Sequence, residues 1–481
     1  MGLHGVEASR SQAVPDGSTA ELTGGQVPQR SSNQFVVTQH ASAMKASLAH
    51  LLPAGVALAV TVGALFNGLD NAFGNAVACL LLSTTALAVF VALPIDVRSL
   101  KNFAFAASPL VAAAVWAMVV SINGFVPDLI LSEALGLASA GLALFCGTQI
   151  GRQRAARFST QHWLVAFGAI VAVLSCAAPL LHEALALQMW APGQNGRFAG
   201  TFGNANVAGA FFATLAILTL ATILGTKESR RPGHLAPRID WQLVSRWLVL
   251  LIAVAACAAT ASRTAITSAI PAIALLLTIR LFKRGQGKHR SPLLLSALAA
   301  GGLVLLLIGA QDLQYRFGSV SGDWSVRQLM WSHYATIAAG SPLTGYGLGS
   351  FPTVNMRFLS DAALAQELWS VNAAHNILIQ LVIDAGLPYL VLIALFMLRV
   401  ARDIFRALRV RPSLLEWGKL LAVGIILVNA MVDIVLEIPM MILLFWTLVG
   451  LLWGRAQSVE VRRPELPPAE HERDISLAAA H

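Results

Sequence analysis

The sequence predicts an all-α polytopic membrane protein with about twelve transmembrane helices. Of its 481 residues, 56% are hydrophobic and only 12% are charged, whereas a soluble domain carries about 25% charged residues. Leu- and Ala-rich runs of about 20 residues, the length that crosses the hydrocarbon core of a bilayer, recur along most of the chain. These runs do not alternate with period two, so we expect helices rather than a membrane β-barrel.

The apolar runs indicate one membrane domain between two polar ends. Residues 1–47 are rich in Ser, Gln, Gly and Thr and are expected to form a disordered cytoplasmic tail, residues 48–454 the membrane domain, and residues 455–481 a cytoplasmic C-terminal tail. The predicted spans are residues 48–68, 73–94, 103–122, 126–147, 162–182, 205–225, 247–262, 264–282, 291–310, 374–398, 415–435 and 438–454.

Basic residues favour an orientation with both termini in the cytoplasm. With the N-terminus inside, each inner connection carries Arg or Lys, for example Arg98 and Lys101 after the second span and Arg399 and Arg402 after the tenth. The outer connections contain no lysine. Because basic short loops stay in the cytoplasm, the long connection at residues 311–373 is expected to be a periplasmic loop.

Two further features of the composition exclude function classes. The net charge of +9 is spread over the inner connections, so it does not indicate binding to nucleic acid. The four cysteines lie inside apolar runs and form no CxxC pair, so neither a disulfide framework nor a metal site is expected.

The segment GRFAGTFGNANVAG, residues 196–209, precedes the sixth predicted span and suits a phosphate group. Its glycines allow close approach of a ligand to the backbone, and Asn204 and Asn206 offer amide donors at a helix start. Arg197 adds a cation where the helix dipole already favours anions. The alternative is a simple helix cap beside an arginine that extends to the membrane surface.

A second candidate is Arg263, in the turn SRTA between two apolar spans. An arginine this close to hydrocarbon is costly unless it faces a water-filled cavity or an anion, so it indicates a functional site. Its planar guanidinium can bind two phosphate oxygens at once. The alternative is interfacial anchoring to lipid headgroups.

A third candidate is His375, in the segment NAAHNILIQLVIDAGLPYL that opens the tenth predicted span. A neutral imidazole there could accept a proton from a hydroxyl group. The alternative is a helix cap or a hydrogen-bonded packing group. Asp384 lies nine residues further on, which in a continuous helix places it on the opposite face and deeper, so we do not expect it to contact His375 directly.

Arg327 is a fourth candidate, in an amphipathic helical stretch of the large loop. The apolar positions on one face of this stretch are Val326, Met330, Trp331, Tyr334 and Ile337. A charge on a wet loop is usually solvated surface, and the same interpretation applies to Asp433 and Glu437 at the last outer turn.

Taken in order, RFAGTFGNAN, SRTA, PLTGYGLGSF and AHNILIQLVIDAGL resemble the O-antigen ligase and O-antigen polymerase superfamily of bacterial inner-membrane glycosyltransferases. The motifs cover roughly residues 195–400, and the earlier spans match only in number and hydropathy. Members often have Pro where this chain has Ala205 and Glu where it has Asp384. The second difference keeps the carboxylate, and neither removes a candidate residue.

The resemblance implies a GT-C-like fold and transfer of a glycan from an undecaprenyl-pyrophosphate donor to an acceptor hydroxyl at the periplasmic face, without metal or nucleotide sugar. Arg197 and Arg263 would hold the pyrophosphate, and His375 would orient or deprotonate the hydroxyl. Asn204, Asn206, Arg327, Tyr346 and Asn376 are expected to bind substrate.

The acceptor stays open: lipid A–core for a ligase, another lipid-linked glycan for an O-antigen or exopolysaccharide polymerase, or a protein hydroxyl. Sugar identity, anomeric outcome and oligomeric state are also open. Two other function classes are a small-anion transporter and a non-catalytic scaffold that binds lipid-linked glycan. A transporter should carry its polar groups near the bilayer midplane, whereas these candidates are expected at the outer end of the bundle.

Overall fold

The computed structural model describes residues 51–66, 72–93, 95, 97–185, 197–225, 240–283, 320–410 and 412–461, and every regular element in them is helical. A first helix covers Leu51–Leu65. The others are α2 (Ala72–Ala92), α3 (Val97–Ile122), the 3-10 helix η2 (Pro127–Leu129), α4 (Ile130–Arg152), α5 (Arg154–Leu185), α6 (Ala205–Gly225), α7 (Trp241–Ala259), α8 (Arg263–Lys283), α10 (Val320–Gly340), α11 (Phe351–Phe358), α12 (Ala362–Leu368), α13 (Ile377–Leu408), α14 (Leu414–Ala430) and α15 (Pro439–Val461).

The described residues confirm an all-helical membrane protein. Nine of their helices are long and apolar enough to cross a bilayer. The predicted ninth span, 291–310, lies outside the described residues, and each other predicted span overlaps a helix. The predicted tail 1–47 also lies outside them, whereas α15 continues past the predicted end of the last span to Val461. The total of twelve spans and the orientation stay predictions.

Helix α6 is the centre of the bundle. Its side chains are buried around the whole circumference, and it packs against α7, α8 and α14. A helix that is apolar on every side is stable only when protein or lipid surrounds it completely. Because Asn204 and Asn206 stand at the start of this helix, the central element of the fold begins at a predicted site.

Glycines allow α4 and α15 to pack at very short distance. A Cβ atom on Gly147 would lie 2.7 Å from the carbonyl oxygen of Thr447, and one on Gly450 would lie 2.6 Å from that of Leu144. Small residues at such contacts let membrane helices approach until their backbones touch. The last span is therefore fixed against the fourth by backbone contact.

An ion cluster joins α5, α14 and α15 at the first turn of α14. Glu416 Oε1 lies 3.1 Å from Arg157 Nη2 and 2.8 Å from Arg455 Nε, and all three side chains are buried. Ser413 and Glu416 also form a reciprocal cap on α14. Arg157, which lies in the connection between the predicted spans 126–147 and 162–182, is thus part of the packed interior.

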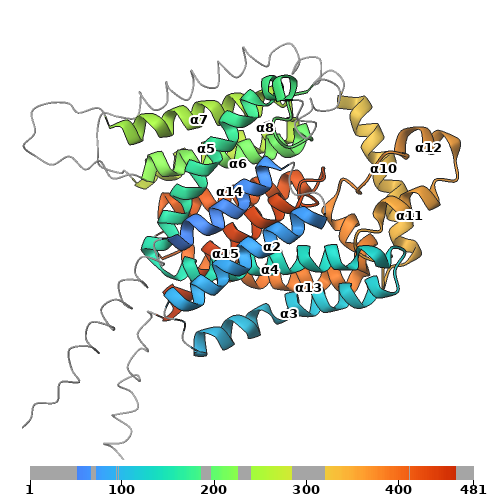
Figure 1. Cartoon of the computed structure of the whole chain (residues 1–481), viewed down its shortest axis with the longest axis horizontal. Coiled ribbons are helices and arrows are strands. Elements are labelled where there is room, and N and C mark those ends of the chain that lie inside the picture. The colour runs from blue at the N-terminus through green and yellow to red at the C-terminus, as the bar shows by residue number, and fades with distance from the viewer. Residues whose placement is uncertain are drawn as a thin grey trace, which may run out of the picture. The chain divides into compact units, whose positions relative to one another are not determined.

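Helix α13 is interrupted at Ala385 and Gly386, although the sequence predicted one continuous span. The loop before α11 covers the break: the backbone N–H groups of Tyr346 and Gly347 donate to the carbonyls of Ile383 and Asp384. The segment PLTGYGLGSF therefore supplies the hydrogen bonds that the broken helix lacks. Helices α10, α11 and α12 gather at this end of the bundle (Figure 1).

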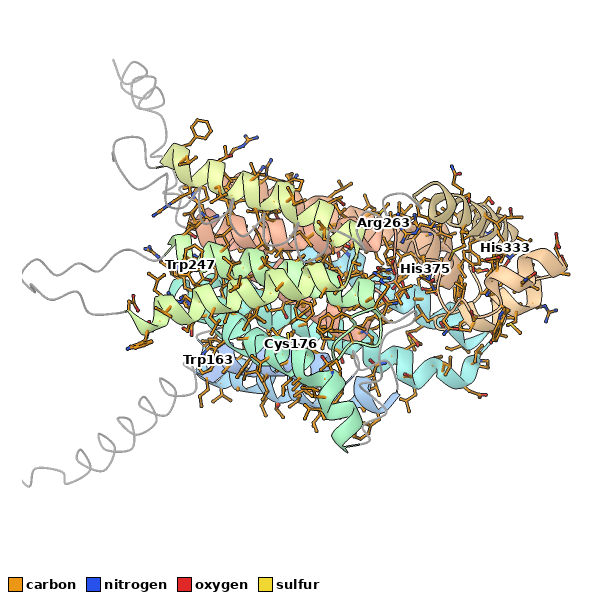
Figure 2. The ribbon with its side chains drawn as sticks, turned by 90° about the horizontal axis from the view of Figure 1, so that it is seen from above. Trp163, Cys176, Trp247, Arg263, His333 and His375 are labelled. Carbon is orange, nitrogen blue, oxygen red and sulfur yellow. The ribbon has the colours of Figure 1, made fainter. Side chains whose placement is uncertain are left out.

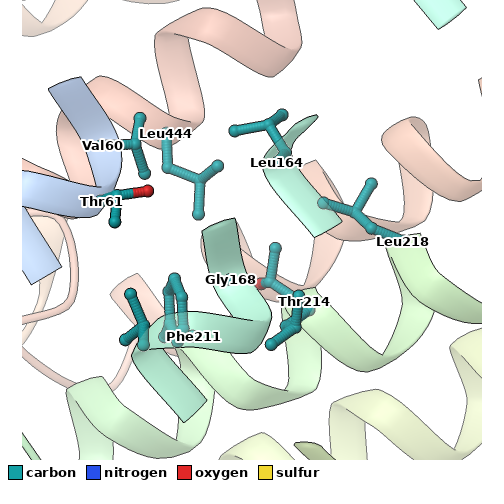
Figure 3. Close-up of a pocket in the computed structure, with 10 residues that line it drawn as sticks. Val60, Thr61, Leu164, Gly168, Phe211, Thr214, Leu218 and Leu444 are labelled. Atoms are coloured by element: carbon teal, nitrogen blue, oxygen red, sulfur yellow. The ribbon is translucent and has the colours of Figure 1, made fainter. Parts of the chain in front are cut away.

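A small apolar cavity lies inside the bundle, between α5, α6, α15 and the first helix (Figure 3). Its volume is about 20 Å³, and Phe211, Leu215 and Leu444 are among its lining residues. None of the residues that line it belongs to the predicted sites. It is a packing defect rather than a substrate cavity.

Candidate functional site

Three separated segments converge on the carboxylate of Asp433, in the turn between α14 and α15. Asp433 is only 5% exposed. Its Oδ2 accepts a hydrogen bond from Asn206 Nδ2 and lies 3.4 Å from Arg327 Nη2, while its Oδ1 lies 3.5 Å from His375 Nδ1. A buried carboxylate needs such partners, because an unpaired buried charge is costly. Asp433 is therefore the residue that assembles the site.

The first motif reaches this carboxylate through Asn206. The amide oxygen of Asn206 accepts from Arg197 Nη2 at 2.9 Å, while its amide nitrogen donates to Asp433. Arg197 also donates from Nε and Nη2 to the carbonyl of Thr260, at 3.1 and 2.8 Å. Arg197 is thus held in place by two neutral acceptors, the Asn206 amide and the Thr260 carbonyl.

Asn204 has a different role from Asn206. Its side-chain oxygen accepts from the backbone N–H groups of Asn206 and Val207, at 2.8 and 3.2 Å, which is the pattern of a helix cap. The capping alternative considered for this motif therefore describes Asn204, whereas Asn206 faces the other candidate residues.

Arg263 begins α8, directly after the turn that Arg197 contacts. Ala261 in this turn has φ +51°, which makes the reversal from α7 to α8 tight. Helix α8 is fixed against α14 by a hydrogen bond from Asn429 Nδ2 to Ser268 Oγ, at 3.1 Å. Because α14 ends at Ala430, the start of α8 and the Asp433 turn lie at the same end of the bundle. Figure 2 shows Arg263 and His375 toward this end, and Trp163 and Trp247 toward the other.

His375 stands in a constrained turn before α13. Its φ is +51°, a left-handed conformation that costs a residue other than glycine about 1–3 kcal/mol. Trp331 Nε1 on α10 donates to the His375 carbonyl at 3.4 Å, and the imidazole is 27% exposed. The fold therefore keeps the ring at one position with part of its surface open.

Asn376 ends the same turn, where it caps α13 and ties it to the Asp433 turn. Its Oδ1 accepts from the N–H groups of Leu378 and Ile379, and its Nδ2 donates to the carbonyl of Met431 at 3.1 Å. Both the oxygen and the nitrogen of the Asn376 side-chain amide are therefore hydrogen-bonded. Asn376 thus positions His375 relative to Asp433.

Arg327 is the contribution of the large loop. The stretch predicted as an amphipathic helix is α10, in which Met330, Tyr334 and Ile337 are buried and Val326 is exposed. Arg327 is 27% exposed and pairs with Asp433. Arg327 is therefore more than a solvated surface charge.

Tyr346 lies in different surroundings. Its hydroxyl donates to the Ile337 carbonyl at 2.8 Å, and its ring packs against Phe125 and Phe358. Its own backbone helps to close the break in α13. The structure thus gives Tyr346 contacts that stabilise the loop rather than contacts with the Asp433 cluster.

The electrostatics of the cluster keep Asp433 ionised. Burial by itself raises the pKa of this carboxyl, but the contact with the His375 imidazole, the hydrogen bond from the N–H of Ile434 and the charge of Arg327 outweigh burial, so the pKa lies below the ordinary 3.8. A carboxylate at Nδ1 favours the imidazole form that carries its proton there. Nε2 is then the nitrogen that can accept a proton.

Asp433 is the functional candidate that the sequence did not single out. It was interpreted as a solvated charge, because a lone carboxylate in a turn carries no motif. Its sequence signal is its position opposite three arginines, Arg197, Arg263 and Arg327, at one end of the bundle. Three arginines at the end of the bundle that holds Asp433 suit an anionic ligand.

The comparison with protein families matches residues 248–394 to the O-antigen ligase family. This segment of the chain is similar to the O-antigen ligase family. The resemblance to the O-antigen ligase and polymerase superfamily is thereby confirmed, and the family implies a glycosyltransferase-like membrane enzyme. The comparison with curated proteins found no match.

The matched segment includes only part of the converging cluster. Arg263, Arg327 and His375 lie inside residues 248–394, whereas Arg197, Asn206 and Asp433 lie outside. Contacts such as Asn206–Asp433 join the segments that flank the domain on both sides. The geometric unit is therefore larger than the matched segment.

Proposed function

We propose that this protein transfers a glycan from an undecaprenyl-pyrophosphate donor to an acceptor hydroxyl at the periplasmic face of the bacterial inner membrane. The acceptor is lipid A–core for a ligase or another lipid-linked glycan for a polymerase. The observation that carries the proposal is the pairing of His375 and Arg327 with buried Asp433, at the end of the bundle where Arg197 and Arg263 also lie. This combines one base with a cluster of cations, the two requirements of the reaction.

In the proposed reaction, the acceptor hydroxyl attacks the anomeric carbon of the donor sugar. Its proton passes to Nε2 of His375, which Asp433 orients through Nδ1. The new C–O glycosidic bond forms while the bond from the anomeric carbon to the phosphate oxygen breaks. The electron pair of that bond leaves with undecaprenyl pyrophosphate.

The arginines are proposed to stabilise the leaving group. Negative charge develops on the pyrophosphate as the sugar departs, and guanidinium groups that are already in place need no reorganisation at that moment. Arg197 is held by the Thr260 carbonyl and the Asn206 amide. Its guanidinium is therefore already in position when the donor binds.

The large loop supplies one side of the site. Arg327 comes from α10, and Trp331 of the same helix contacts the His375 turn. A displacement of α10 would alter both the charge around Asp433 and the support of His375. We propose that α10 covers the site when donor and acceptor are bound.

The break in α13 is the observation that would favour a transporter, because transporters bind substrates at interrupted helices. Here the polar groups of the break have protein partners: Trp116 Nε1 donates to the Ala385 carbonyl at 2.8 Å, and Gly347 donates to that of Asp384. The break is thus filled by the chain itself, which favours the enzyme over the transporter.

Surface-polysaccharide profiling in a deletion strain of the source organism tests the proposal. The strain is complemented with wild type, Arg263→Ala or His375→Ala, each checked for membrane expression. Wild type should restore polymer or capped lipopolysaccharide, and both variants should fail while expressed. Long chains missing from lipid A indicate a ligase, and single repeat units indicate a polymerase. Full complementation by His375→Ala would refute the mechanism.

A further inference from the structure

The His375 turn is connected to Asp384 by two consecutive hydrogen bonds that the mechanism does not use. Gln380 Oε1 accepts from the backbone N–H of Ala374 at 2.8 Å, and Gln380 Nε2 donates to Asp384 Oδ1 at 3.0 Å. Ala374 is the residue immediately before His375. Asp384 is therefore linked to His375 through Gln380 and the backbone, although the side chains of Asp384 and His375 are not in contact.

The connection is buried along its whole length. Ala374 is 0% exposed, Gln380 is 4% exposed and Asp384 is 8% exposed. Both ends of the Gln380 amide are occupied, so its orientation is fixed: the oxygen faces the turn and the nitrogen faces the carboxylate. Buried polar networks of this kind hold a single geometry, since any other leaves a polar group unpaired.

The far end of the connection is itself anchored. Asp384 is the last residue before the interruption of α13, and its carbonyl accepts from the N–H of Gly347. The loop that fills the break therefore fixes Asp384 from the other side. A rigid support is needed here because His375 has an unfavourable left-handed backbone.

We infer that Gln380 and Asp384 are positioning residues for His375: together they hold the left-handed turn that presents the imidazole to Asp433. This rests on the proposed function of His375 as the base. Displacement of a catalytic group by about 1 Å can lower a rate about 100-fold. The interaction therefore has a functional consequence without any contact to substrate.

The test exchanges the hydrogen-bond donor and the hydrogen-bond acceptor between positions 380 and 384. Gln380→Leu removes both bonds, and Gln380→Glu places two carboxyl groups against each other. The double variant Gln380→Glu/Asp384→Asn restores both bonds: the new carboxylate still accepts from the N–H of Ala374, and the bond between positions 380 and 384 is reversed because the new amide donates to that carboxylate. Gln161→Leu is the matched control, since Gln161 is 0% exposed and bonds to Lys419 at 2.9 Å in the opposite half of the bundle.

Two readouts are needed on the full-length protein. Polymer formation in the complemented deletion strain should fall about tenfold or more for Gln380→Leu and Gln380→Glu, and should return to within about twofold of wild type for the double variant. Carbethoxylation of His375 by diethyl pyrocarbonate, measured by mass spectrometry relative to His333, should rise in the single variants and return in the double variant. Gln161→Leu should leave this ratio unchanged.

The inference is overturned if Gln380→Leu, expressed as well as Gln161→Leu, keeps wild-type polymer and an unchanged His375 ratio. If Gln380→Leu does not fold, the double variant provides the test. A double variant that is expressed but is no more active than Gln380→Glu also overturns the inference. Activity of His375→Ala would instead refute the proposed function, so the two failures are distinguishable.

Discussion

The amide nitrogen of Asn206 donates a hydrogen bond to Oδ2 of Asp433 across 227 positions of the sequence. The amide oxygen of the same side chain accepts from Arg197. Asn206 therefore links a cation of the first motif to the carboxylate of the last turn, and its orientation is fixed from both sides. This link brings the sixth predicted span into the same site as His375.

Asn206→Asp should abolish polymer formation in the complemented strain. The substitution removes the donor to Asp433 and places a second carboxylate beside the first in a buried setting, where like charges repel strongly. Asn204→Ser is the control, because serine caps a helix about as well as asparagine. Asn204→Ser should keep activity within about twofold of wild type. Equal loss in both variants would show that only the start of α6 matters.

Asp433→Asn should lower transfer about 100-fold without loss of membrane expression. The amide keeps the shape of the side chain but loses the charge that orients the imidazole and pairs with Arg327. Asp128→Asn is the control, since Asp128 is an exposed aspartate of η2. A fully active Asp433→Asn would remove Asp433 from the mechanism.

The lowered pKa of Asp433 predicts how stability depends on pH. Because the folded protein favours the ionised carboxylate, the contribution of Asp433 to stability is present above its ordinary pKa of 3.8 and is lost as pH falls through the lower folded value. The difference in melting temperature between wild type and Asp433→Asn should therefore be fully present at about pH 5 and shrink below about pH 4. A difference that vanishes already near pH 6 would contradict this assignment.

Glu416→Gln should destabilise the protein without changing the site. Removal of this carboxylate leaves Arg157 and Arg455 buried without their counter-ion, which costs about 3–5 kcal/mol. Asp403→Asn is the control, because Arg402, its partner in an ion pair, is 59% exposed and such pairs contribute about 0–1 kcal/mol. Thermal unfolding in detergent should separate the two variants. Polymer formed per folded molecule should stay at the wild-type level in both.

The helical fold could be predicted from the sequence because membrane helices satisfy their own backbone and must be apolar over a fixed length. The break in α13 was missed, although Gly386 and Pro388 lie two residues apart and both disrupt helices. The hydropathy of a whole span is an average, so two helix-disrupting residues hardly change it. The loop that fills the break comes from a distant segment of the sequence, which a local pattern does not reveal.

The candidate site was predicted in part, because arginine or histidine beside an apolar span stands out by its cost. Arg197, Asn206, Arg327 and His375 do meet in contacts around one carboxylate. Asp433 could not be identified in the same way, since an aspartate in a turn is ordinary. Its role depends on which side chains the fold brings to it.

The most direct test of the central claim is a transfer assay with purified full-length protein in liposomes that contain lipid-linked glycan and acceptor lipid from the deletion strain. Wild type should release undecaprenyl pyrophosphate and form the glycosylated acceptor in equal amounts. His375→Ala should do neither and should still retain the donor, whereas Arg263→Ala should retain less of it. Release and transfer by His375→Ala at the wild-type rate would contradict the account.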